Sequence, residues 1–323
     1  MEKQHEINSM GVVYVILLLG NIVIYTLSLI LPNMGIRLPS TMCTVLCEIA
    51  ILLPTIIYIK SKGDNISKRL GFHKIKISTV LLTVLLTLAT TPIYIFTNLF
   101  SQLFVKNTVV QNSSEMLGGS AILTLIVVSV MAPICEEIAF RGFLFDGLKG
   151  IFPIIKAAVV SALLFGIMHL NFNQFCYAFV LGVIFALANH ASGSTWTSVI
   201  MHSLFNFVNV SIFLAMQFSL EAQNIDIVQE QEAVRSQTGA MLYAVIFWGL
   251  ISVICVFLVW LLLKAIAKNQ GNLEAFKSSF ARKDQLDAST DTGVRVHSLL
   301  NVPMVFSVLI GIAAMIIYQV TVL

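Results

Sequence analysis

The chain has 323 residues, of which 58% are hydrophobic and 11% are charged. This composition excludes an ordinary soluble domain, in which about 25% of residues are charged. The formal net charge of +3 comes from loop residues and favours contact with anionic lipid over contact with nucleic acid. We therefore expect one membrane-embedded, all-α protein.

Nine apolar stretches come close to the length of about 20 residues that a membrane-spanning helix needs. The first follows a short polar N-terminus, is long for a signal-peptide core and lacks a small-residue cleavage site, so we expect a retained helix. The predicted fold is a polytopic helical bundle of eight to nine helices, since the last helix can be an appendage to a core of eight. The predicted helices are 11–31, 41–59, 77–104, 119–147, 153–170, 173–190, 195–217, 240–267 and 302–321.

Basic residues concentrate in alternate loops, which predicts the orientation. The positive-inside rule then places the N-terminus in the cytoplasm and, with nine spans, the C-terminus outside. A re-entrant segment in place of one span would change that parity. We expect a multi-pass protein of the cell membrane. The basic residues of the predicted cytoplasmic loops are Lys60, Lys62, Lys68, Arg69, Lys74, Lys76, Lys149, Lys156, Lys264, Lys268, Lys277, Arg282, Lys283 and Arg295.

The chain shows no internal repeat and divides by content into three regions. Residues 1–118 supply N-terminal transmembrane helices, and residues 119–217 supply the helices that carry intramembrane charge. Residues 218–323 contain an eighth and a ninth helix with two polar loops. Of those loops, we expect 218–239 to form an acidic external segment and 268–300 a flexible cytoplasmic connector. The sequence does not indicate an oligomeric state.

Two glutamates and an arginine, Glu136, Glu137 and Arg141, close the apolar run from Ala121 to Cys135. Each charge costs roughly 2.5–3.5 kcal/mol at the centre of a membrane helix, so such residues are rare and usually functional. Glu137 and Arg141 are four residues apart and can form an ion pair on one helix face. Glu136 is rotated by about 100° and can face a polar cavity as a general base. The alternative is that all three residues only lock two helices together.

Two further pairs with four-residue spacing supply polar partners. His169 follows Phe165, which we expect to position the imidazole by packing, and Asn206 follows His202. Each pair alone could simply hydrogen-bond neighbouring helices. Together with the acids, they can activate water and stabilise an oxyanion. His169 lies about 24 Å along its helix, deeper than the others, so convergence requires a tilt or a break near Gly166.

These elements, in this order, resemble the CPBP family of intramembrane proteases, which includes the type II CAAX prenyl endopeptidases and Abi-type proteins. The family pattern is EExxxR, FxxxH and HxxxN. The chain reads Glu136-Glu137-Ile-Ala-Phe-Arg141, Phe165-Gly-Ile-Met-His169 and His202-Ser-Leu-Phe-Asn206. The resemblance covers about residues 119–210, with no departure at a motif position.

The resemblance implies an intramembrane endopeptidase that acts on membrane-associated proteins or peptides. Glu136 resembles the base that activates water, and His169 resembles a residue that holds that water. His202 and Asn206 resemble the oxyanion stabilisers, while Glu137 and Arg141 resemble supports. The family has been described both as metalloproteases and as glutamate-dependent proteases. Zn²⁺ is therefore possible, although the chain has no HExxH pairing and asparagine is a poor zinc ligand.

Two other classes of protein remain open. A non-catalytic bacteriocin-immunity or scaffolding protein could keep the charged residues as a structural network. A transporter could use them as a proton relay, but we find neither the inverted repeats nor the broken helices that this predicts. Among other polar residues, Glu48 could line the same cavity or hydrogen-bond a neighbour. We expect solvent to satisfy the residues at helix ends, namely Asn171, Asn173, Asn189 and His190.

Overall fold

The computed structural model describes residues 2–107, 120–223, 225, 227–281 and 301–321. Within these ranges all regular structure is helical, which confirms the predicted all-α fold. Most elements are α-helices, but η1 is a 3₁₀ turn, and η2 and η3 are π-helical. In chain order they are α1 (Glu2–Ile30), η1 (Leu31–Met34), α2 (Ser40–Ser61), α3 (Ile66–Arg69), α4 (Ile77–Gln102), α7 (Ala121–Ile126), η2 (Val127–Met131), α8 (Ala132–Glu137), η3 (Ile138–Phe145), α9 (Asp146–Lys149), α10 (Ile154–Met168), α11 (Phe172–Ser192), α12 (Thr195–Ala222), α13 (Ile227–Ser236), α14 (Thr238–Gln270), α15 (Leu273–Ala281) and α16 (Val302–Thr321).

Within the described residues, eight helices are long and apolar enough to cross a membrane, as expected of a multi-pass membrane protein. The segment Ala121–Lys149, from α7 to α9, counts as one of them. This count lies within the predicted range of eight to nine helices. The predicted helix 153–170 is not among the eight, because α10 has 15 residues and is about 22 Å long. A hydrocarbon core is about 30 Å thick. The last residue of α10, Met168, is buried, and the last turn lies well away from the end at which the helix begins.

Contacts between distant segments show which loops share one end of the bundle. Arg69 after α2 pairs with Glu6 near the N-terminus at 3.0 Å and with Asp146 in α9 at 3.2 Å. Asn301, before α16, donates to the carbonyl of Ile7 at 3.2 Å. The N-terminus and the second, fourth and eighth loops thus lie at the same end, as their shared basic character predicts. Which side of the membrane that end faces stays a prediction.

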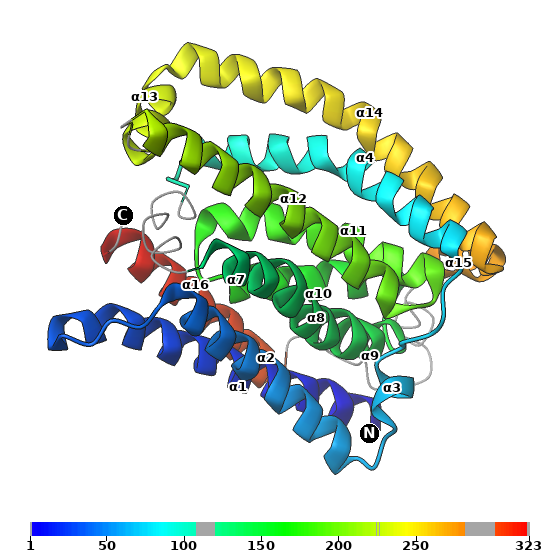
Figure 1. The fold of residues 1–323 in the computed structure, drawn as a ribbon. Coiled ribbons are helices and arrows are strands. Elements are labelled where there is room, and N and C mark those ends of the chain that lie inside the picture. The colour runs from blue at the N-terminus through cyan, green and yellow to red at the C-terminus, as the bar shows by residue number, and fades with distance from the viewer. Residues whose placement is uncertain (1, 108–119, 224, 226, 282–300, 322–323) are drawn as a thin grey trace.

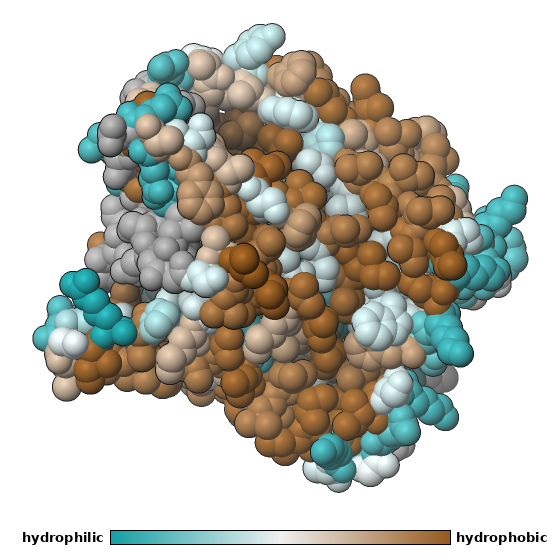
Figure 2. All heavy atoms as spheres, viewed as in Figure 1, coloured by the Kyte–Doolittle hydropathy of each residue, from teal (hydrophilic) through white to brown (hydrophobic). Residues whose placement is uncertain are grey.

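The surface divides in the way a membrane requires. In Figure 2, the middle of the visible face is covered by hydrophobic residues, and hydrophilic residues gather towards the two ends. At the end away from the N-terminus, Lys106 pairs with Glu232 of α13 at 3.2 Å. Exposed apolar side chains such as Leu250 and Val253 of α14, at 68% and 72% exposure, suit contact with lipid.

Figure 1 shows the helices in three groups. On one side α1, α2 and α16 lie together, and on the opposite side α4 runs along α14. The segment from α7 to α9, with α10, α11 and α12, lies between them and forms the centre of the bundle. Helix α4 presents buried threonines, including Thr83 and Thr87, whose hydroxyls donate to carbonyls four residues earlier. Their hydrogen bonds are satisfied within the helix, which permits burial in an apolar setting.

Helix α16 packs against both α1 and α10. A Cβ atom at Gly311 would lie 2.2 Å from Cγ2 of Ile167, so only glycine allows α16 to approach α10 this closely. A Cβ at Gly11 of α1 would meet Asn301 and Pro303 at 3.0 and 3.1 Å. The last helix, α16, therefore packs closely within the bundle. It contacts α10 at Ile167, two residues before His169.

Both predicted polar loops begin with more helix than expected. Helix α12 continues to Ala222 and α13 covers part of the acidic segment, while α14 continues to Gln270 and is followed by α15. The reason in α15 is Phe276, which is fully buried with its ring centroid 5.7 Å from that of Trp260. The prediction of a flexible connector is therefore wrong for residues 273–281. Residues 282–300 and Asp226 lie outside the described residues.

Candidate active site

The helical segment that carries the acids is irregular on both sides of them. Turns of π-helix, η2 and η3, flank α8, and such turns occur frequently at functional sites. Pro133 has no backbone N–H, so it cannot donate a hydrogen bond to the carbonyl of Val128, one π-helical turn earlier. Asn206 of α12 donates to that carbonyl instead, at 2.9 Å. In η3 the carbonyl of Phe140 accepts from Ser161 of α10 at 2.8 Å. Neighbouring helices thus hold the irregular segment in place.

The ion pair expected from the spacing of Glu137 and Arg141 is present. Nη1 of Arg141 lies 2.7 Å from Oε1 of Glu137, and both side chains are fully buried. The guanidinium also stacks on Phe165, 4.3 Å from the ring centroid, and approaches Phe185 at 5.3 Å. Gly182 of α11 leaves room for it, since a Cβ there would lie 3.0 Å from Nη2. Two rings, one carboxylate and one glycine therefore accommodate this buried cation.

His202 of α12 lies between the two glutamates. Its Nδ1 is 3.0 Å from Oε1 of Glu137, and its Nε2 is 3.6 Å from Oε2 of Glu136. An ionised carboxylate only accepts hydrogen bonds, so the proton on His202 belongs at Nδ1 when Glu137 is ionised. Oε1 of Glu137 then accepts from both Arg141 and His202. This contact fixes the imidazole plane and directs Nε2 towards Glu136.

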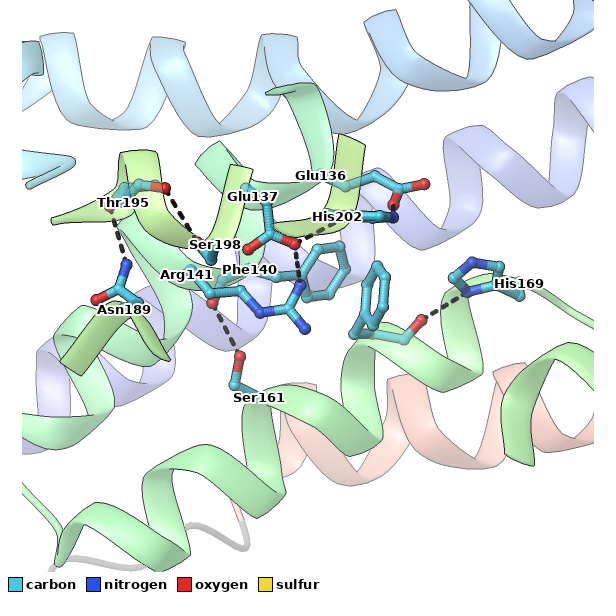
Figure 3. A network of polar contacts seen from close by, with 11 residues as sticks. Glu136, Glu137, Phe140, Arg141, Ser161, His169, Asn189, Thr195, Ser198 and His202 are labelled. Carbon is cyan, nitrogen blue, oxygen red and sulfur yellow. Dashed lines mark hydrogen bonds and ion pairs between the residues drawn. The ribbon is translucent and has the colours of Figure 1, made fainter. Parts of the chain in front are cut away.

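The two adjacent glutamates therefore have different surroundings. Glu137 is fully buried and bound on one oxygen by two donors, whereas the Glu136 side chain is 14% exposed. In Figure 3, Glu137 points towards Arg141, and Glu136 lies on the other side of His202, nearer to His169. Only Glu136 combines partial accessibility with a nearby imidazole nitrogen. The rotation of about 100° between neighbouring helical residues produces this difference.

His169 follows α10 directly and completes the group. Its Nδ1 lies 2.9 Å from the carbonyl oxygen of Phe165. A carbonyl only accepts, so Nδ1 carries a proton and the neutral ring has a lone pair on Nε2. The ring of Phe165 is 5.0 Å from the His169 ring and 5.8 Å from the His202 ring. Phe165 thus contacts both histidines as well as Arg141, which extends the positioning role expected for it.

No hydrogen bond joins His169 to a glutamate in the described part of the chain, but Glu136 and His202 both act on its ring electrostatically. The break considered near Gly166 is absent, because α10 is continuous to Met168. Gly166 instead lets α11 approach, since a Cβ there would lie 2.9 Å from the Phe175 ring. Leu170 reverses the chain with a φ of +55°, a conformation that is uncommon for residues other than glycine.

One residue beside the site, Tyr14, carried no signal in the sequence. Tyr14 of α1 is fully buried, and its hydroxyl donates to the carbonyl of Leu164 in α10 at 2.7 Å. Its ring meets that of Phe140 edge to face at 6.3 Å. A tyrosine in an apolar span is not distinctive, and only the packing of α1 on α10 reveals its role. The hydrogen bond of Tyr14 links α10, the helix directly before His169, to the N-terminal helices.

The prediction that solvent satisfies the polar residues at helix ends is wrong for at least two of them. Asn173 is 1% exposed and donates to Oδ1 of Asn98 and Oγ of Ser101, both at 2.8 Å. Asn189 is 4% exposed and donates to Oγ1 of Thr195 at 3.0 Å. The ends of α11 are therefore buried against other helices, and side chains replace water as the partners.

The donor atoms of the site do not form a ready zinc site. Among the described residues, no three His, Cys, Asp or Glu side chains come together as a metal ion would require. Oε1 of Glu137 and Nδ1 of His202 are engaged with each other. Structural and catalytic zinc sites use at least three protein ligands, so in this arrangement the residues do not fit the metal.

Comparison with protein families matches residues 118–208 to the model described as type II CAAX prenyl endopeptidase Rce1-like. MroQ of Staphylococcus aureus, named a membrane-embedded CAAX protease, is 38% identical over 85 residues, which are 24% of this chain and 34% of MroQ. YdiL of Bacillus subtilis, provisionally named a membrane peptidase, is 29% identical over 103 residues, or 32% and 42% of the two chains.

An uncharacterized protein of Mycoplasma capricolum is 32% identical over 99 residues, 29% of this chain and 28% of its own. The matches thus span between 28% and 42% of these relatives. No solved structure matches the chain. The matched segment contains all three motifs, from Glu136 to Asn206. The segment 118–208 is therefore Rce1-like in sequence, and the family resemblance predicted from the motifs is confirmed.

Proposed function

We propose that this protein is an intramembrane endopeptidase that hydrolyses peptide bonds with a water molecule activated by Glu136. The observation that carries the proposal is the difference between the two adjacent glutamates. Glu137 is fully buried and held by Arg141 and His202, while Glu136 is partly accessible, with Nε2 of His202 at 3.6 Å. A purely structural network needs only one ion pair, so a structural role does not explain the second acid, Glu136.

In the proposed reaction, the Glu136 carboxylate takes a proton from water as the oxygen attacks the peptide carbonyl carbon. The electron pair of the carbonyl bond moves to its oxygen and forms a tetrahedral oxyanion. When that intermediate collapses, the carbon–nitrogen bond breaks, and Glu136 returns its proton to the leaving nitrogen. The products are a carboxylic acid and an amine, and Glu136 is regenerated as the carboxylate.

The histidines and the asparagine supply position and hydrogen bonds. His169 donates through Nδ1 to the Phe165 carbonyl, so its Nε2 can accept a hydrogen bond from the attacking water. His202, when doubly protonated, can donate through Nε2 to the oxyanion. Asn206 uses one amide hydrogen for the carbonyl of Val128 and has a second for the same purpose. Glu137 and Arg141 act through His202 as supports.

The mechanism has no step through a metal, because the donor set of the site does not fit zinc. The chain's own residues perform each proton transfer. A bound metal would supply a Lewis acid and a more acidic water, and the response to chelators separates these two forms of the chemistry.

We infer a substrate that is itself a protein or peptide in the membrane. The irregular segment lies among helices that cross the bilayer, so the scissile bond must reach membrane depth. MroQ is named a CAAX protease, which makes prenylated C-terminal peptides a substrate class to test. Under the positive-inside rule, the loops near Arg69 and Lys149 face the cytoplasm, and the substrate would approach from that leaflet.

A comparison of protein termini in cells tests the proposed function. Cells producing the wild-type protein are compared with cells producing Glu136→Gln at matched abundance. Glu274→Gln is the matched control, because its side chain is 85% exposed and pairs with Lys277 far from the site. New peptide termini should be present with wild type and the control and absent with Glu136→Gln. Identical profiles for all three, with folded protein and an intact phenotype, would favour an immunity or scaffolding role.

A further inference from the structure

The carbonyl of Val128 in η2 is skipped by the backbone hydrogen bonds of its own helix. In an α-helix this carbonyl would accept from the N–H of Ala132, four residues later. The N–H of Ala132 donates instead to Val127, five residues back, as in a π-helix. The next donor in that register would be Pro133, which has no N–H. The shifted register and the proline together leave the Val128 carbonyl available to a partner outside the helix.

Asn206 of α12, which packs against η2, is that partner. Its Nδ2 donates to the Val128 carbonyl at 2.9 Å. A carbonyl only accepts hydrogen bonds, whereas a side-chain amide has a donating nitrogen and an accepting oxygen. Turning the amide over would therefore place two oxygens face to face. The contact keeps Nδ2 towards Val128 and, because the amide group is planar, also fixes the direction of the second hydrogen on that nitrogen.

The direction of that hydrogen matters for an oxyanion. An amide N–H stabilises a developing negative charge, while an amide oxygen in the same place would repel it. Asn206 lies one helical turn after His202, whose Nδ1 is held by Glu137 at 3.0 Å. Both proposed oxyanion donors of α12 are therefore oriented by contacts with the segment from η2 to α8. For Asn206 the contact depends on a backbone carbonyl that its own helix does not use.

We propose that Pro133 is a positioning residue for Asn206: because it lacks an N–H, it keeps the Val128 carbonyl available to the asparagine amide and so fixes the direction of the second amide hydrogen. The proposal rests on the proposed function insofar as Asn206 stabilises an oxyanion. In Pro133→Ala the backbone regains an N–H, which competes for the Val128 carbonyl from within the helix. The Asn206 amide then loses its partner and can turn its oxygen into the site.

Nuclear magnetic resonance of the side-chain amides tests the orientation without any substrate. The amide signals of Asn206, in protein labelled with nitrogen-15 at asparagine, are identified by their absence in Asn206→Ala. In Pro133→Ala its hydrogen-bonded proton should shift upfield, towards the position of an amide without that bond. Asn209 is the internal control, because its Nδ2 donates to the carbonyl of Phe205 in its own helix at 2.8 Å, and its signals should stay in place. Unchanged Asn206 signals in Pro133→Ala would overturn the proposal.

A double-variant cycle in kcat, at equal folded fraction, separates positioning from a structural role. Pro133→Ala should lower kcat by at least about tenfold with KM nearly unchanged, and by no more than Asn206→Ala, because removing one oxyanion donor costs about 10²–10³ in kcat. When Asn206→Ala is already present, Pro133→Ala should cause no further loss. Pro92→Ala is the matched control, because Pro92 also lies inside a membrane helix, α4, and its carbonyl accepts from Ser252 of α14 at 3.0 Å. It should leave kcat unchanged.

The possible failures are distinguishable. An equal loss from Pro133→Ala with and without Asn206→Ala would mean that the proline acts on the fold as a whole, and would refute the positioning role. A wild type without turnover would refute the proposed function itself, and the amide signals would then decide the orientation of Asn206 alone.

Discussion

The Glu137–Arg141 ion pair gives a quantitative test of how the site is held together. Both side chains are fully buried at a separation of 2.7 Å. In Arg141→Met, Glu137 keeps only His202 as a partner and becomes a largely uncompensated buried charge. Breaking such a pair costs about 3–5 kcal/mol of the free energy of unfolding. Lost stacking of the guanidinium on Phe165, at 4.3 Å, adds up to about 2 kcal/mol.

The second perturbation removes the charge that the first one exposes. In Arg141→Met/Glu137→Gln, no uncompensated charge remains, so the double variant should be more stable than the sum of the two single changes predicts. We expect a coupling of about 2 kcal/mol, in the upper half of the range for contacting residues. The assay is reversible unfolding of purified protein in mixed micelles, with wild type, both single variants and the double variant measured together.

A surface pair provides the matched control. Lys277 and Glu274 lie 3.0 Å apart with side chains 51% and 85% exposed. The cycle of Lys277→Met and Glu274→Gln should give a coupling below about 0.5 kcal/mol. If the cycle at Glu137 and Arg141 gave a coupling as small as this control, the ion pair would not stabilise the site and its assignment as a support would fail.

Three further predictions concern helix packing, the histidines and the metal. Gly311→Leu should lower the free energy of unfolding by about 1–3 kcal/mol through overpacking against Ile167. Adding Ile167→Ala to this variant should recover part of the loss. If calorimetry showed no loss in Gly311→Leu, α16 would not contact α10. Phe165→Leu should lower kcat by at least tenfold with little change in KM, because the ring contacts both His169 and His202; an unchanged kcat would show that the ring does not position them. Treatment with a strong chelator should leave turnover unchanged, and a loss that zinc restores would replace the glutamate mechanism with a metal-dependent one.

Local spacing predicted the part of the site that lies within single helices. Glu137 and Arg141 pair because four residues make nearly one helical turn, and the same period places His202 and Asn206 on one face. Their partners could not be predicted in the same way. His202 bonds to Glu137 across 65 residues, and Asn206 bonds to Val128 across 78. These contacts depend on how α12 packs against the irregular segment.

The sequence also does not indicate the π-helical turns or the length of α10. Pro133 marks a missing donor, but the shift in helix geometry that accompanies it becomes visible only with the backbone. The end of α10 depends on Leu170, whose φ of +55° has no signature in residue type, because glycine or asparagine is usual there. Buried polar contacts between helices, such as Tyr14 to Leu164, likewise arise from tertiary packing.

The most direct test of the central claim is turnover by purified protein in liposomes, with a peptide found in the terminus comparison as substrate. Wild type, Glu136→Gln and the control Glu274→Gln are measured at equal protein and equal folded fraction. If Glu136 activates the water, Glu136→Gln should lose at least a thousandfold in kcat, about 4 kcal/mol of transition-state stabilisation, while the control keeps wild-type turnover. Turnover by Glu136→Gln within tenfold of wild type would contradict the assignment of Glu136 as the base.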